Sequence, residues 1–307
     1  MVIAAAVAVL AVAALVLQAG RQGGPSGPGS GYPVLPTTPG AYIGLYPEGV
    51  PGSYSGVAEF TAATGIRPSV VPYYSGWLEP FQAGFAAIAA DNGAVPLVQM
   101  DPDNISVAAI ASGKYDAYLS DFAEAVRAYH RPVILSFGHE MNGNWYSWAS
   151  QHTPPAVFVA AWRHIVRLFR AQGARNVTWL WAVNVINSQS GVPSPRPWWP
   201  GSSYVTWVGI DGYYLNPSST FASLFGPTIA AVRALTHAPV LIAETAAAPA
   251  TGQPAKIADL FAGVRLYRLL GFVWFDAVHD TDWRLRSREA IAAFRRNAGA
   301  QRPAPAG

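Results

Sequence analysis

The chain has 307 residues, of which 51% are hydrophobic and 12% are charged, and its formal net charge is +3. A chain of this length and hydrophobicity can bury a large core, and its scattered charges do not form the basic patch of a nucleic-acid-binding protein. The absence of cysteine excludes disulfides, thiolate zinc sites, iron–sulfur clusters and cysteine nucleophiles.

The chain opens with an uncharged apolar run at residues 2–17. This run is too long for one face of a helix and slightly short for a membrane span, so residues 1–19 are predicted to be an export signal or a membrane anchor. Residues 20–40 are rich in Gly, Pro and Ser, which predicts a flexible linker. We therefore expect an extracellular or cell-surface protein with one folded domain at 41–297 and a disordered tail at 298–307.

Eight short apolar runs follow, each with the length and composition of a buried strand. They are residues 41–46, 67–74, 94–100, 131–137, 176–183, 204–210, 238–244 and 271–276. Segments with helical periodicity separate them, at residues 54–64, 81–90, 116–129, 155–171, 219–235, 256–270 and 286–296. Apolar strands that alternate with helices indicate a parallel sheet, and eight repeats in about 260 residues predict a (β/α)8 TIM barrel. An open doubly wound sheet is disfavoured, because no glycine-rich phosphate loop follows the first strand.

Reactive side chains in such a barrel lie at the carboxyl ends of the strands. The predicted ends carry Tyr73, Tyr74, Trp77, Asp101, His139, Glu140, Asn184, Asp211, Tyr213, Glu244, Trp274 and Asp276. Glu140 and Glu244 end the fourth and seventh strands, which face each other across the barrel mouth. Two carboxylates about 5 Å apart that flank a glycosidic bond are the arrangement of a retaining glycosidase.

Spacing excludes two other chemistries. The zinc motif H-E-x-x-H that could start at His139 needs a second histidine at position 143, where the chain has Gly143. A serine esterase needs the motif G-x-S-x-G directly after a strand, and none of the predicted strands is followed by it. The two glutamates therefore remain the best candidates for catalysis.

The segment GHEMNGNWYSW, residues 138–148, resembles the signature of glycoside hydrolase family 26. This family consists of (β/α)8 barrels and contains β-mannanases, mixed-linkage β-glucanases and β-1,3-xylanases. Other segments that resemble the family occur in the right order, at residues 161–184, 198–214, 239–245 and 272–285. The chain departs from the family pattern at Ser202 and Thr206, where acidic residues are frequent, and we expect both to be structural.

The resemblance implies that Glu140 is the general acid/base, that Glu244 is the nucleophile, and that Tyr213 donates a hydrogen bond to the nucleophile. Elementary electrostatics agrees with these roles. A general acid must stay protonated near neutral pH, and an apolar aromatic setting with a second carboxylate nearby raises the pKa in that direction. A tyrosine hydroxyl beside Glu244 favours the ionised form that a nucleophile needs.

The resemblance also implies that three side chains line the subsite where cleavage occurs, namely His139, Trp145 and Trp274. Trp77, Asn142 and Asn184 are further candidates, because sugar faces stack on aromatic rings and sugar hydroxyls need amide partners. Each candidate has a structural alternative. The tryptophans can belong to the core, and the histidine can satisfy a backbone carbonyl.

We therefore expect a retaining endo-β-glycosidase with β-1,4-mannan as its substrate, because mannanases dominate the family that the chain resembles. Mixed-linkage β-glucan and β-xylan are the alternative substrates. A non-catalytic carbohydrate-binding barrel is the rival from another class, and the intact pair of glutamates argues against it. The expected mechanism needs no metal or organic cofactor. The expected partner is a polysaccharide and not a nucleic acid, and we expect a monomer that can be tethered to a membrane through residues 1–19.

Overall fold

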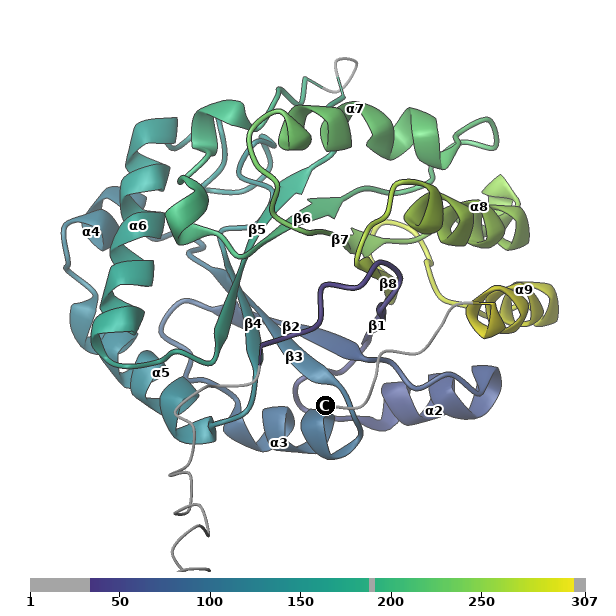
Figure 1. The fold of residues 1–307 in the computed structure, drawn as a ribbon, viewed down its shortest axis with the longest axis horizontal. Helices are drawn as coiled ribbons and strands as arrows, with labels where there is room; N and C mark the ends of the chain where they lie inside the picture. Colours follow the sequence, from purple (N-terminus) through teal and green to yellow (C-terminus); the bar gives the residue numbers. More distant parts are fainter. Residues whose placement is uncertain (1–33, 188–190, 301–307) are drawn as a thin grey trace, which may run out of the picture. The chain divides into compact units, whose positions relative to one another are not determined.

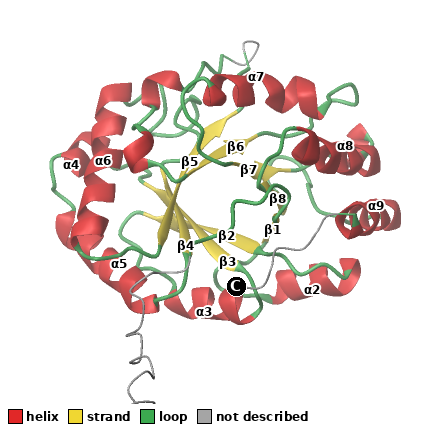
Figure 2. Ribbon diagram, viewed as in Figure 1, coloured by secondary structure: helices red, strands yellow, loops and turns green. Residues whose placement is uncertain are grey.

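The computed structural model describes residues 34–187 and 191–300. Eight parallel strands form a closed barrel in chain order, and helices surround it (Figures 1 and 2). The strands are β1 (Tyr42–Pro47), β2 (Val70–Gly76), β3 (Val95–Asp101), β4 (Val133–Phe137), β5 (Val177–Asn184), β6 (Trp207–Asp211), β7 (Val240–Thr245) and β8 (Gly271–Asp276). The predicted (β/α)8 TIM barrel is confirmed.

The helices lie between successive strands and after the last one. They are α2 (Ser55–Thr64), α3 (Ala83–Asp91), α4 (Val107–Ala111), α5 (Asp116–Tyr129), α6 (Pro155–Ala171), α7 (Phe221–Arg233), α8 (Gln253–Leu266) and α9 (Arg288–Gly299), with 3-10 turns η1 (Arg196–Trp198), η2 (Ser202–Tyr204) and η3 (Pro249–Thr251). Local chemistry sets several of their N-termini. A capping box between Thr220 and Ser223 opens α7, and the Ser287 hydroxyl caps α9. The short helix α4 is absent from the predicted elements, because five residues are too few to show a helical period.

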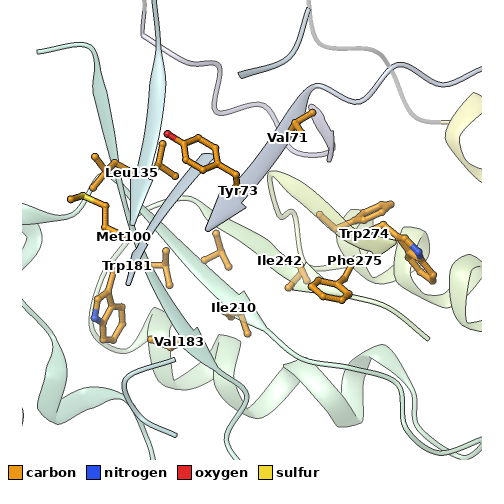
Figure 3. Packing of buried hydrophobic residues seen from close by; sticks show 14 of the residues in the cluster. Val71, Tyr73, Met100, Leu135, Trp181, Val183, Ile210, Ile242, Trp274 and Phe275 are labelled. Carbon is orange, nitrogen blue, oxygen red and sulfur yellow. The ribbon is translucent and has the colours of Figure 1, made fainter. Parts of the chain in front are cut away.

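Side chains along each strand alternate between the barrel interior and the surrounding helices. The interior is filled by one apolar cluster, which includes Val70, Leu97, Ile134, Leu180, Trp207, Leu241 and Val273. A larger cluster packs between the barrel and the helices, and Figure 3 shows part of it. Because this packing plugs the barrel, a substrate can reach only its ends.

The domain boundaries differ slightly from the predicted ones. Residues 1–33 and 301–307 lie outside the described residues, so the predicted export signal or anchor and most of the linker lie there too. Leu35 belongs to the predicted linker, yet it is buried in the interior cluster, and the Tyr42 hydroxyl donates to Pro36 O at 2.8 Å. The folded domain therefore begins several residues before Ala41. In the described part of the chain, no helix combines the length and apolar character that crossing a bilayer requires.

Close packing between α7 and α8 gives a stability prediction. A Cβ added at Gly263 would lie 2.0 Å from Cγ of Phe221, whose buried ring also packs on Phe225 with 4.8 Å between ring centroids. We expect Gly263→Ala to lower the free energy of unfolding by about 1–3 kcal/mol in chemical denaturation, because the ring has no room to yield. Gly84→Ala is the control, since a Cβ there meets no heavy atom within 4 Å. Equal stability of the two variants would contradict the prediction.

Candidate active site

Glu140 lies in a tight turn that directly follows β4. The turn holds both Gly138 and Glu140 in the left-handed backbone region, with φ values of 55° and 54°. A glutamate in this region is strained, so its surroundings must hold it there. The Gly138 amide donates to Met100 O at 2.9 Å, and the Glu140 amide donates to Ala182 O at 3.0 Å. These two bonds tie the turn to β3 and β5 and fix the position of the carboxylate at the carboxyl end of the barrel.

The Glu140 carboxylate is buried, with 6% of the residue exposed, and accepts two hydrogen bonds. Asn184 Nδ2 donates to its Oε1, and Trp145 Nε1 donates to its Oε2 at 2.8 Å. Burial and the nearby charge of Glu244 raise the pKa of Glu140 to about 7, although the His139 charge and the two hydrogen bonds oppose the shift. Glu140 can therefore hold or release a proton near neutral pH.

The Glu244 carboxylate, on β7, has a different environment. The Tyr74 hydroxyl from β2 donates to its Oε2, and the Tyr213 hydroxyl from the end of β6 donates to its Oε1. Hydrogen bonds that a carboxylate accepts stabilise its ionised form. Tyr213 occupies the position expected of it. Tyr74 was predicted to lie at a strand end but was not predicted to be a site residue. In the structure it lies at the end of β2 and faces the barrel interior.

The two glutamates belong to one continuous cluster. Along the barrel, Asn184 pairs with Asp211 and Asp211 pairs with Glu244 in the strand register, while the Asn184 amide reaches Glu140. On the other side, the Tyr74 ring that binds Glu244 lies 5.5 Å from the His139 ring. Side chains at the ends of β2, β4, β5, β6 and β7 therefore surround a single centre.

His139 is the third member of this centre that can carry charge. Its Nδ1 bonds Asp101 Oδ1 at 2.9 Å, and its Nε2 bonds the Tyr146 hydroxyl at 3.1 Å. Burial lowers the pKa of His139, but the charge and hydrogen bond of Asp101, together with the charges of Glu140 and Glu244, raise it to about 10. The raised pKa favours the imidazolium, in which both ring nitrogens carry a proton. The sequence placed Asp101 at the end of a predicted strand, without assigning it to His139, and did not indicate Tyr146.

Asp211 adds a buried acid to the centre. The residue is fully buried, and neither carboxylate oxygen has a hydrogen-bond partner among the described residues. Burial, followed by the charges of Glu244 and Glu140, raises the pKa of Asp211 well above its usual range, which favours its neutral carboxyl. Across the described residues, no group of three or more His, Cys, Asp or Glu side chains is placed to hold a metal ion.

Asn142 has a different place from the one expected of it. The residue is fully buried, and its Nδ2 donates to the carbonyl oxygens of Asn184 and Pro193 at 3.0 and 3.1 Å. Its Oδ1 accepts the Asn184 amide at 2.9 Å. Asn142 therefore holds the backbone of Asn184 and has no free amide to offer to a sugar hydroxyl.

Two of the predicted aromatic contacts also lie outside the centre. Trp274 is fully buried and packs on Phe294 of α9, while its neighbour Phe275 leaves β8 in another direction (Figure 3). Trp77 packs among other rings, and the closest are those of Tyr118 and Tyr115 at 5.2 and 5.6 Å. Strand alternation thus turns Trp274 toward the outer core and away from the glutamates, and Trp77, which directly follows β2, lies in an aromatic cluster.

Other aromatic rings lie around the glutamates instead. Phe275 stacks on Tyr46 at 4.8 Å, and Trp283 from the loop after β8 lies 4.6 Å from Tyr213. Trp145 is the most exposed of the tryptophans near the glutamates, with 45% of the residue open to solvent. A polar centre lined by aromatic rings at a barrel mouth suits a carbohydrate, whose rings have apolar faces and polar edges.

Comparisons with known proteins agree with this geometry. Residues 102–296 match the model of the family described as Glycosyl hydrolase family 26. Endoglucanase H of Acetivibrio thermocellus is 32% identical over 278 residues, which are 85% of this chain and 30% of that protein. A mannan endo-1,4-beta-mannosidase of Caldalkalibacillus mannanilyticus is 30% identical over 88 residues, 26% of this chain and 16% of that protein. The chain thus spans less than a third of the length of these curated relatives.

The barrel is also similar to solved structures. A modular endo-beta-1,4-mannanase from Cellulomonas fimi superposes with a TM-score of 0.67 at 16% identity, covering 86% of this chain and 71% of that one. At such low identity the likeness concerns the fold alone. The family match and the long similarity to endoglucanase H concern the sequence itself, and together they show that this chain belongs to glycosyl hydrolase family 26.

Proposed function

We propose that this glycoside hydrolase is a retaining endo-β-glycosidase, with Glu140 as general acid/base and Glu244 as nucleophile. The observation that carries the proposal is the contrast between two carboxylates of one cluster. Glu140 is buried, and its pKa is raised to about 7, whereas Glu244 accepts hydroxyl hydrogen bonds from Tyr74 and Tyr213. A buried carboxyl with a raised pKa suits proton transfer, and a carboxylate that two hydroxyl groups hold in place suits attack.

The two steps of the reaction follow from these environments. In the first step, Glu244 attacks the anomeric carbon while Glu140 gives its proton to the departing glycosidic oxygen, which leaves a covalent glycosyl ester. In the second step, ionised Glu140 takes a proton from water as the water attacks the same carbon. The ester bond to Glu244 breaks, the sugar is released with its configuration retained, and Glu140 is protonated again.

Other side chains of the centre are proposed to bind the substrate. The exposed Trp145 ring offers a stacking surface next to Glu140, and the Asn184 amide can donate to a sugar hydroxyl. His139, whose two ring nitrogens bond Asp101 and Tyr146, lines the same centre. We also propose export to the cell surface or beyond, which rests only on the apolar run at residues 2–17 and on the polymeric nature of the substrate.

For the substrate itself, the comparisons change the order of preference. The similarity to endoglucanase H extends over 85% of the chain, whereas the similarity to the mannosidase extends over 26%. We therefore propose a β-glucan as the first choice and β-1,4-mannan as the second. Incubation with lichenan, mannan and xylan, followed by measurement of new reducing ends, decides between them. A barrel that binds one of these glycans without releasing reducing ends is the outcome that overturns the proposal.

The two tyrosines that bind Glu244 give a matched pair of variants. Tyr74→Phe and Tyr213→Phe each remove one hydroxyl and keep the ring, so each leaves one oxygen of Glu244 without its donor. We expect kcat to fall by about 10- to 100-fold in each, because a hydrogen bond to a charged group contributes about 1.5–3 kcal/mol. Steady-state kinetics on the preferred glycan tests this. Wild-type kcat in both variants, with unchanged thermal unfolding, would contradict it.

A further inference from the structure

The Trp145 indole lies directly against Gly143, two residues earlier in the same loop. A Cβ added at Gly143 would lie 2.5 Å from Cζ2, 2.6 Å from Cη2 and 2.8 Å from Cε2 of the indole. All three atoms belong to the ring, and real Cβ atoms essentially never approach other atoms so closely. The φ angle of Gly143 lies outside the left-handed region, so its backbone conformation is open to alanine. The missing side chain is therefore needed for space and not for backbone freedom.

We propose that Gly143 is a positioning residue for catalysis, because its bare Cα lets the Trp145 indole lie across the turn and donate its N–H to Glu140 Oε2. The inference rests on the proposed function, since it concerns the same acid/base. It adds a requirement that the roles of the two glutamates do not contain. Position 143 must stay without a side chain for the indole to reach the carboxylate.

The backbone around Gly143 is held more firmly than the indole. The Gly143 amide donates to Glu140 O at 2.8 Å, and its carbonyl oxygen accepts from the Ser150 amide at 3.0 Å and the Ser150 hydroxyl at 2.6 Å. The Trp145 residue, in contrast, is 45% exposed. An added methyl group therefore moves the indole off Glu140 and leaves the turn in place.

The Trp145 indole and Asn184 bind different oxygens of the Glu140 carboxylate. Asn184 Nδ2 occupies Oε1 of Glu140, and the indole occupies Oε2 at 2.8 Å. An N–H donor favours the ionised carboxylate, so the indole opposes the rise in the pKa of Glu140. The titratable groups that act on Glu140 directly or through His139 are Asp101, His139, Tyr146, Asp211, Tyr213 and Glu244. Gly143→Ala changes none of these groups, so a shift in the pKa of Glu140 in that variant reports the indole.

A double-mutant cycle between positions 143 and 145 tests the inference. In the wild-type background, we expect Gly143→Ala to lower kcat/KM on the preferred glycan by about 10- to 100-fold, the effect of a misplaced contact in an active site. The alkaline limb of its pH profile should move to higher pH. In the Trp145→Ala background the added methyl group meets no indole, so Gly143→Ala should change kcat/KM by less than about twofold. Equal losses in both backgrounds, or no loss in either, would overturn the inference.

A spectroscopic measurement makes the test independent of turnover. The fluorescence of Trp145, taken as wild type minus Trp145→Ala, should titrate with Glu140 near pH 7 and lose that titration in Gly143→Ala. Gly84→Ala is the control for a methyl group added elsewhere and should keep it. Titration that persists in Gly143→Ala overturns the inference alone. If Glu140→Gln keeps full activity, it is the proposed function that fails.

Discussion

Glu244→Ala should lower kcat/KM on the preferred glycan by at least about 10,000-fold, the order of loss expected when a nucleophile is removed from a hydrolase. We expect this large loss because no other carboxylate among the described residues can replace Glu244 as the nucleophile. Asp211 pairs with Glu244 in the strand register, but it is fully buried, and burial raises its pKa and so disfavours the ionised form that attack needs. Initial rates of reducing-end release measure the loss.

The design of this experiment separates a lost nucleophile from a lost fold. Added azide should restore activity of Glu244→Ala toward an activated aryl glycoside, because the small anion can enter the space of the carboxylate and attack the anomeric carbon. The product should then be a glycosyl azide of inverted configuration. Glu124→Ala, a change on the exposed surface of α5, serves as the control and should keep full activity. Rescue that yields a retained azide would assign the attacking role to a different group.

Much of the barrel was readable from the sequence because each element follows a simple periodic pattern. Helices α5 and α6 begin and end at the predicted residues, since both carry a regular apolar face. All eight strands are present, with ends within about three residues of the predicted ones, which is the usual precision of such boundaries. A strand that is buried on both faces can be predicted from its apolar run alone, without knowing which face points into the barrel.

Side-chain direction at the strand ends was less predictable for the same reason. Successive residues of a strand point to opposite faces, so an error of one residue moves a side chain from the site to the outer core. Adjacent residues of β8 show this alternation, since Trp274 packs under α9 while Phe275 lies near Tyr213 at 6.0 Å. Register shifts near Asp211 on β6 and within β7 add to the difficulty, because they change the alternation where Glu244 lies.

Contacts between residues that are far apart in the sequence could not be predicted. Tyr74 is 170 residues from Glu244 in the chain, and Asp101 is 38 residues from His139. A single sequence indicates which residues reach the rim of the barrel, but it does not indicate which of them touch. Proton affinities depend on those contacts, so the raised pKa values of His139 and Asp211 emerge only from the structure.

The pH dependence of catalysis tests the proton-transfer role of Glu140. Its pKa is raised to about 7 by burial and by the charge of Glu244, and the first step needs the protonated form. We therefore expect kcat/KM of the free enzyme to be lost as pH rises through about 7, and not as pH falls through it. The same sign holds for stability, because folding favours the neutral carboxyl. That contribution is full below 4.5, the ordinary pKa of a glutamate, and is lost as pH rises through about 7.

Glu140→Ala should remove this alkaline limb and reveal which step needs the proton. On a polysaccharide, whose leaving group is a poor one, kcat/KM should fall by about 100- to 10,000-fold, the range for general acid catalysis. On an aryl glycoside with a dinitrophenolate leaving group, the loss in kcat/KM should be much smaller, because that group departs without a proton. Glu289→Ala on α9 is the control and should keep the wild-type pH profile. Equal losses on both substrates, with the alkaline limb unchanged, would mean that Glu140 is not the group that protonates the leaving oxygen.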